Sequence, residues 1–157
     1  MLKTILLLST LLSFAFGDSL KITTPLQAFN NFKYTTQHDK KVSISDDIKT
    51  IIISYEKDTG RLVNKYLNTK YPPYLAKNRA IFIADIHEMP SIITKLFAMP
   101  KMRKYNHTIY IYDEDDFSKF AKPQDEKVTV IKIKDKKVDK IYYISTTQEL
   151  KEAFENW

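Results

Sequence analysis

The sequence predicts one α/β domain in three layers, with helices on both faces of a central mixed sheet and a C-terminal hairpin plus helix. Three observations predict this class. Short runs of consecutive apolar residues are typical of strands buried on both faces. Segments with apolar residues at helical spacing separate these runs, which implies parallel strands joined by crossover helices. Two strand-like runs then follow one another directly, as in a hairpin.

The first core strand is predicted at Ile51–Tyr55, where three successive isoleucines form a continuous apolar run. Residues 18–45 before it should be an irregular or β-rich lead-in, with a short strand at 41–44. A helix should follow it, capped by Asp58 or Thr59 and ended by the prolines of 71–74. The apolar face of this helix is predicted to consist of Leu62, Val63, Tyr66 and Leu67.

A second buried strand is expected at 80–84, ending at Asp85. The next helix should open at Met89-Pro90-Ser91, since proline is well tolerated in a first helical turn, and Pro100 should close it. Its apolar stripe has the same spacing as that of the first helix, and we expect it to face the core. This stripe consists of Ile92, Ile93, Leu96 and Phe97.

A third strand is predicted at 108–112, followed by one or two helical turns at 116–121. The runs 128–133 and 138–144 indicate a hairpin around Asp135-Lys136. Thr146 and Glu149 then form a capping-box pattern before a last helix. Its inward residues should be Leu150, Ala153, Phe154 and Trp157. This order of elements is that of the thioredoxin fold.

The N-terminal residues 1–17 have the pattern of a secretory signal peptide. Lys3 precedes an apolar run at 5–16, and small residues at Ala15 and Gly17 favour cleavage before Asp18. An uncleaved interfacial anchor is the alternative. The mature chain, 18–157, is one domain in length and has no later run long enough to span a membrane. We therefore expect a periplasmic or secreted protein.

Composition excludes several kinds of chemistry. The chain has no cysteine, which excludes thiol redox chemistry, thiolate metal sites and cysteine nucleophiles. With two glycines it has no Gly-rich phosphate loop, and we expect no cofactor. The net charge of +6 is spread over a surface that also carries many acids, so we expect no nucleic-acid partner.

Several short motifs carry a resemblance to a known group of proteins. They are Gln37-His38-Asp39-Lys40, the strand 51–55, the run 84–90, and the run 97–102 with Tyr105. Together they resemble uncharacterised exported bacterial proteins with a thioredoxin-like fold that lacks the Cys-x-x-Cys pair. The resemblance implies the same fold and the same inherited loss of the cysteine pair.

Both halves of a thioredoxin redox site are missing. The stretch after the first core strand, 54–61, contains no cysteine, and the stretch before the third strand, 105–108, contains no proline. The sequence therefore predicts that the protein is not a thiol-disulfide oxidoreductase. We expect a non-enzymatic binding or accessory module whose partner is an exported protein or peptide.

Polar residues at the ends of the predicted strands form the expected binding surface, because open α/β sheets bind ligands at the carboxyl ends of their strands. The members of this surface are Glu56, Lys57, Asp58, Asp85, His87, Glu88, Asn106 and His107. A small molecule bound at the same strand ends is one alternative. No Ser/His/Asp triad is evident, and no catalytic residue is predicted.

A metal-handling protein is another alternative, because imidazole and thioether ligands suit copper. The weak candidate ligands are His87, Met89 and Met99; the methionines could equally fill gaps in the core. The acidic run 113–116 could attract a divalent cation or simply begin a helix. Lysines of the hairpin, 132–140, could protect a sheet edge or contact an anionic surface.

Overall fold

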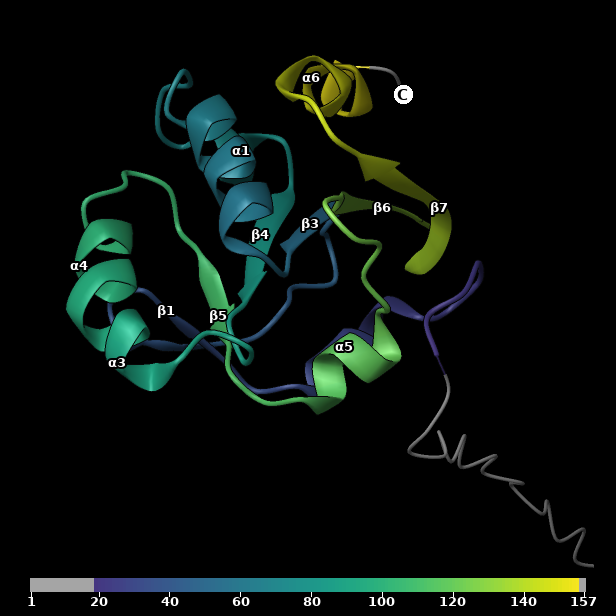
Figure 1. The fold of residues 1–157 in the computed structure, drawn as a ribbon. Coiled ribbons are helices and arrows are strands. Elements are labelled where there is room, and N and C mark those ends of the chain that lie inside the picture. Colours follow the sequence, from purple (N-terminus) through teal and green to yellow (C-terminus); the bar gives the residue numbers. More distant parts are fainter. Residues whose placement is uncertain (1–18, 156–157) are drawn as a thin grey trace, which may run out of the picture.

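The computed structural model describes residues 19–155, which form a seven-stranded mixed sheet with helices on both faces (Figure 1). The strand order is β2-β1-β5-β4-β3-β6-β7. This arrangement confirms the predicted three-layer α/β class with a C-terminal hairpin and helix. The predicted signal segment, its expected cleavage site at Gly17 and Trp157 lie outside the described residues.

The centre of the sheet is parallel and almost entirely buried, with only Tyr110 partly exposed. It consists of β3 (Thr50–Ser54), β4 (Ala80–Asp85) and β5 (Tyr110–Tyr112). Ile52 lies opposite Phe82, and Ala84 lies opposite Ile111, so that the carboxyl ends of the strands meet at one edge of the domain. The uninterrupted apolar runs correctly predicted β3 and β4, because their side chains pack on both faces.

Antiparallel strands complete the sheet on both sides. β1 (Tyr34–Thr36) pairs with β5 and with the two-residue β2 (Lys41–Val42). On the other side β6 (Val128–Lys134) pairs with β3, and β7 (Lys137–Ile144) pairs with β6. Asp135 and Lys136 join β6 to β7 with positive φ values of 50° and 59°, as two-residue hairpin turns require.

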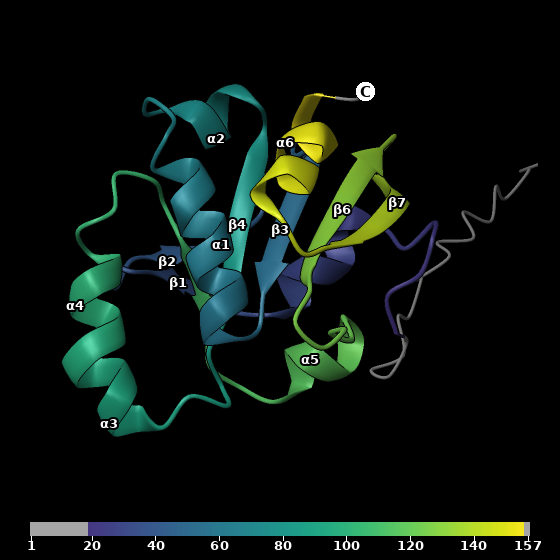
Figure 2. The ribbon, with the colours of Figure 1, turned by 45° about the horizontal axis from the view of Figure 1, so that its top comes forward.

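One face of the sheet is covered by α1 (Lys57–Leu67), the short α2 (Tyr74–Lys77) and α6 (Thr147–Glu155), as Figure 2 shows. The sequence did not predict α2, which follows the prolines expected only to end α1. The opposite face is covered by the 3-10 helix η1 (Leu26–Asn31) and by α5 (Asp116–Phe120). Each face has its own core cluster, with Val63 and Phe82 in the first and Phe29 and Phe117 in the second.

Side-chain caps begin α1 and α6. The N-cap residue of α1 is Glu56, whose backbone N–H donates to the Thr59 hydroxyl at 3.1 Å. Of the two residues predicted to cap this helix, Thr59 therefore takes part in the cap and Asp58 does not. Asp58 lies inside the first turn and pairs with Arg61 instead. The capping box predicted for α6 is confirmed: the Thr146 N–H donates to the Glu149 carboxylate, and the Glu149 N–H donates back to the Thr146 hydroxyl.

Pro100 does not close the helix that begins after Pro90, contrary to the prediction. The helix continues through α3 (Ser91–Ile93), a π-helical turn η2 (Thr94–Ala98) and α4 (Met99–Met102), together called the 91–102 helix. The Met99 N–H bonds the Thr94 carbonyl five residues back, whereas the Arg103 N–H bonds Met99 four residues back. Pro100 falls between these two bonds, where its missing N–H is tolerated.

The apolar stripe of the 91–102 helix does not face the core, contrary to the prediction. Its four side chains are exposed by 63, 43, 62 and 65%: Ile92, Ile93, Leu96 and Phe97. The residues that pack against the first core cluster are Met89, Met99, Met102 and Tyr105, from the opposite side and the two ends of the helix. The helix is amphipathic, as predicted, but its bulkier apolar face is exposed to solvent.

Candidate functional site: an apolar groove beside helix α1

A groove of about 680 Å³ lies between α1 and the 91–102 helix, at the carboxyl ends of β3 and β4. Its base is apolar, with Phe82, Ala84 and Ile109 from the sheet region. One wall is formed by Gly60 and Asn64 of α1, and the other wall belongs to the 91–102 helix. The second wall comprises Ile93, Phe97, Ala98, Lys101 and Met102. The groove therefore combines an apolar interior with an exposed apolar rim.

Charged side chains of both signs line the rest of the groove. Glu56, Lys57 and Arg61 come from the start of α1, Glu88 precedes the 91–102 helix, and Lys101 lies near its end. The Glu56 carboxylate is already engaged, because it accepts the Glu126 backbone N–H at 3.2 Å. Arg61 pairs with Asp58 at 2.9 Å, but both side chains are largely exposed, and such pairs add little stability.

The structure brings half of the predicted binding surface to this groove. Glu56, Lys57, Asp85 and Glu88 line it, whereas Asp58 and His87 do not. Asn106 and His107 line a second hollow of about 400 Å³. This second hollow lies beside the Tyr71-Pro72-Pro73-Tyr74 segment and the start of β4. The predicted surface is thus divided between two cavities.

His107 connects the two cavities through one hydrogen bond. Its Nε2 lies 2.7 Å from the Asn64 amide oxygen, so Nε2–H is the donor, and its ring stacks on Tyr105. Asn64 and Tyr105 both line the groove. Burial lowers the pKa of His107 to about 4, which keeps the ring neutral near pH 7. His107 therefore supports the groove wall from behind.

The Gln37 side chain holds the stretch of chain that stands where thioredoxins have a proline before the third core strand. The amide group of Gln37, itself buried, donates to the His107 carbonyl at 2.7 Å and accepts the Ile109 N–H at 2.9 Å. At the equivalent of the cysteine position, the buried Ser54 ends β3, and its Oγ lies 3.5 Å from where a Cβ on Gly60 would stand. The first place is therefore held by hydrogen bonds from Gln37, and the second is occupied by a buried serine packed close to Gly60 of α1.

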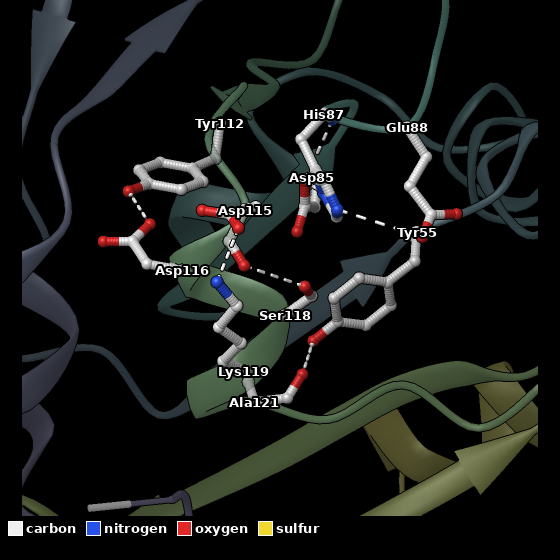
Figure 3. A network of polar contacts seen from close by, with 10 residues as sticks. All are labelled: Tyr55, Asp85, His87, Glu88, Tyr112, Asp115, Asp116, Ser118, Lys119 and Ala121. Atoms are coloured by element: carbon white, nitrogen blue, oxygen red, sulfur yellow. Dashed lines mark hydrogen bonds and ion pairs between the residues drawn. The ribbon is translucent and has the colours of Figure 1, made fainter. Parts of the chain in front are cut away.

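Asp85 and His87 form a hydrogen-bonded pair at the end of β4 (Figure 3). The His87 Nδ1 lies 2.7 Å from Asp85 Oδ1, and the His87 backbone N–H donates to the same oxygen at 3.2 Å. The other carboxylate oxygen, Oδ2, is buried and has no hydrogen-bond partner among residues 19–155. Burial raises the pKa of Asp85, and the hydrogen bonds from His87 partly oppose this shift.

The acidic run 113–116 begins α5, beside the same pair (Figure 3). Asp115 forms an ion pair with Lys119 at 2.5 Å, one helical turn later, and this pairing lowers the pKa of Asp115. Asp116 accepts a hydrogen bond from the Tyr112 hydroxyl. These contacts agree with the interpretation of the run as a helix start.

The weak candidate metal ligands His87, Met89 and Met99 are each engaged in contacts within the described residues. His87 Nδ1 is engaged with Asp85, and His87 Nε2 lies 3.9 Å from the Glu88 carboxylate. Met89 and Met99 pack against the first core cluster. In the described part of the chain, no three His, Asp or Glu side chains gather in a way that could hold a metal ion.

The residues that form the apolar rim and one end of the groove were not predicted from the sequence. Ile93 and Phe97 were assigned to the core because their spacing marks an amphipathic helix. Met102 and Tyr105 lay within the motifs that carry the family resemblance, but nothing in the sequence placed them beside α1. The run of four bulky residues next to several lysines, without acids, was the available signal of an exposed face.

Comparison with known proteins supports the fold alone. No family model and no curated protein matches the chain. Among solved structures, an uncharacterised thioredoxin-like protein from Porphyromonas gingivalis superposes with a TM-score of 0.54 and 15% identity, covering 83% of this chain and 91% of its own. A putative protein disulfide isomerase from Bacteroides thetaiotaomicron gives a TM-score of 0.51 and 15% identity, with 89% and 90% coverage.

A third similar structure is a SCO1/SenC family lipoprotein from Bacillus anthracis, with a TM-score of 0.51, 14% identity, and coverage of 88% and 94%. The chain is thus a thioredoxin-like α/β protein without cysteine. Among residues 19–155, the helices are all too short or too polar to cross a bilayer.

Proposed function

We propose that this protein is an exported, non-enzymatic binding module that receives an apolar segment of a peptide or protein in the groove between α1 and the 91–102 helix. The observation that carries the proposal is the groove itself: about 680 Å³, apolar at its base, with the exposed Phe97 and Ile93 on its rim. Large exposed apolar side chains beside a hollow are typical of interaction sites.

The position of the groove favours binding over catalysis. It lies at the carboxyl ends of β3 and β4, where open α/β sheets bind ligands. The chain has no cysteine to act there. The wall made by Ile93 and Phe97 projects into solvent, whereas a small-molecule site encloses most of its ligand. An extended peptide segment can cover such an open rim.

The test is a selection of displayed random peptides on the chain without its first 17 residues, followed by affinity measurement on the enriched sequences. Residues 19–155 contain the whole sheet and both core clusters, so this form retains the fold. Phe97→Ser should weaken binding by about ten-fold or more, since an aromatic anchor is lost. Leu96→Ser is the matched control, because Leu96 is equally exposed but does not line the groove.

Two outcomes would contradict the binding proposal: no peptide is enriched, or the enriched peptides bind Phe97→Ser and the native chain equally. A blank thiol-disulfide reductase assay is expected in either case. Export is tested separately by expressing the full chain in a bacterium and determining the N-terminus by mass spectrometry. Release into the periplasm with Asp18 as first residue supports export; retention of the intact chain in the cytoplasm contradicts it.

A further inference from the structure

The 91–102 helix carries a second apolar surface that does not belong to the groove. Ile92 and Leu96 lie one turn apart on the exposed side of the helix, and neither lines the groove. Among the large apolar residues of the described chain that are strongly exposed, half belong to this one helix. A cluster of this kind indicates an interaction surface rather than chance exposure.

The segment that carries this surface is positively charged. The segment 91–105 contains Lys95, Lys101, Arg103 and Lys104, and it contains no Asp or Glu. Arg103 is used internally, because its guanidinium donates to the Gln37 carbonyl and to the Asp39 carboxylate. The three lysines are exposed and form no ion pair within residues 19–155. The nearest acid in sequence, Glu88, precedes the helix.

The helix stands at one side of the molecule with no other element over its outer face, as Figures 1 and 2 agree. Its inner side is fixed by Met99, Met102 and Tyr105 against the first core cluster. The Arg103–Asp39 ion pair, 2.9 Å long, further ties its end to the turn between β1 and β2. The outer face is therefore presented to solvent on a rigid support.

We propose that this face docks on an anionic lipid bilayer, with Ile92 and Leu96 entering the interface and Lys95, Lys101 and Lys104 contacting lipid phosphates. A helix that lies in the interface combines bulky apolar residues with flanking lysines, and its length is not decisive. Lysines that form no ion pair, on a segment that contains no Asp or Glu, complement an anionic surface, whereas a protein partner would have to supply the matching carboxylates. The proposal does not depend on a ligand in the groove, although Lys101 also lines it.

Vesicle flotation tests this proposal with the chain lacking residues 1–17, so that the apolar N-terminal run does not contribute. The native chain should float with vesicles of phosphatidylcholine and phosphatidylglycerol, and much less with phosphatidylcholine alone. Replacing Ile92 and Leu96 by serine should weaken the association about ten-fold for each residue. Replacing Lys95, Lys101 and Lys104 by glutamine should weaken it about five-fold for each lysine, and most strongly at low salt.

Two controls separate lipid docking from general effects. The hairpin lysines Lys134, Lys137 and Lys140 are also exposed, so their replacement by glutamine removes equal charge from another place. The hairpin variant should retain most of its association with anionic vesicles. An unchanged thermal unfolding curve shows that each variant is folded.

Three results would overturn the proposal. One is failure of the native chain to float with anionic vesicles at low salt. Another is an equal loss of binding in the hairpin control and the helix variant. The third is a concentration-dependent dimer, found by analytical ultracentrifugation, that the Ile92 and Leu96 changes abolish, since the face would then join two copies of this chain.

Discussion

The side chain of Gln37 reaches across to the backbone of His107 and holds it at 2.7 Å, although 70 residues separate the two in sequence. The same amide accepts the Ile109 N–H, so one buried side chain satisfies two backbone groups of the stretch before β5. This stretch carries His107, which supports the groove wall through Asn64. Gln37 thereby links the β1–β2 turn to the groove.

Gln37→Ala should lower the free energy of unfolding by about 2–4 kcal/mol, because it leaves one buried and one partly buried backbone group without their partner. Denaturant unfolding of the two proteins measures the difference. Gln148→Ala is the matched control, since Gln148 is exposed and bonds only Glu152 one turn away. Equal stability of Gln37→Ala and the native chain would show that water replaces the amide at no cost.

Two leucines at opposite extremes of burial give a second prediction. Leu67 of α1 is buried in the first core cluster, so Leu67→Ala should cost about 2–5 kcal/mol. Leu96→Ala removes the same atoms from an exposed position and should change stability by less than about 0.5 kcal/mol. Thermal or denaturant unfolding compares them. A large loss in Leu96→Ala would mean that the outer face of the 91–102 helix is covered.

His107 should make the fold sensitive to acid. Burial lowers the pKa of His107 to about 4 in the folded chain, whereas an unfolded histidine has a pKa of about 6.5. Between these values the unfolded chain binds more protons, so the free energy of unfolding falls as the pH is lowered from about 6.5 to 4. The expected loss is about 1–2 kcal/mol, allowing for the partial exposure of the ring.

The measurement is denaturant unfolding of the native chain and of His107→Gln across this pH range. Glutamine can still donate to Asn64 but does not titrate, so the variant should lack this part of the pH dependence. His38→Gln is the control, because His38 is exposed in the β1–β2 turn. Parallel pH profiles for the native chain and His107→Gln would contradict the prediction.

Lys132 gives a prediction at the alkaline end. This β6 lysine is 2% exposed, its Nζ donates to the Thr50 hydroxyl at 3.1 Å, and it lies 5.5 Å from the centre of the Phe154 ring. Burial lowers the pKa of Lys132 to about 8, below the value of about 10.4 for an unfolded lysine. Between these values the unfolded chain binds more protons, so stability should rise with pH.

We therefore expect the native chain to gain about 3 kcal/mol relative to Lys132→Met between pH 8 and pH 10.5. The comparison with a variant removes the contribution of all other groups, because the two proteins share them. Lys134→Met, on the same strand but exposed, should follow the native profile. A constant difference between the native chain and Lys132→Met would show that Lys132 titrates as in the unfolded chain.

Features that depend on a local residue pattern were predictable from the sequence, whereas features that depend on how distant segments pack together were not. β3 and β4 were predictable because continuous apolar runs need burial on both faces. The cap of α6 was predictable because Thr146 and Glu149 lie within one turn. The stripe containing Phe97 was not, because helical spacing shows that an apolar face exists but not which neighbours cover it.

The candidate site was predictable only in outline. The carboxyl ends of β3 and β4 were expected to carry it, and Glu56 and Glu88 do line the groove there. Its walls depend on contacts between segments that are distant in sequence, such as Asn64 with His107. No spacing rule reports such contacts, and the π-helical turn that carries the chain past Pro100 has no simple sequence signature.

The two edges of the sheet hold different parts of the molecule. The 91–102 helix is fastened by Arg103 to the turn beside β1 and β2, at one edge of the sheet. At the other edge, Thr23 near the start of the described chain bonds Val138 of β7. An affinity tag, dye or surface linkage attached near Thr23 would therefore lie at the sheet edge opposite the helix, so an immobilised sample presents the outer face of the 91–102 helix to the solution.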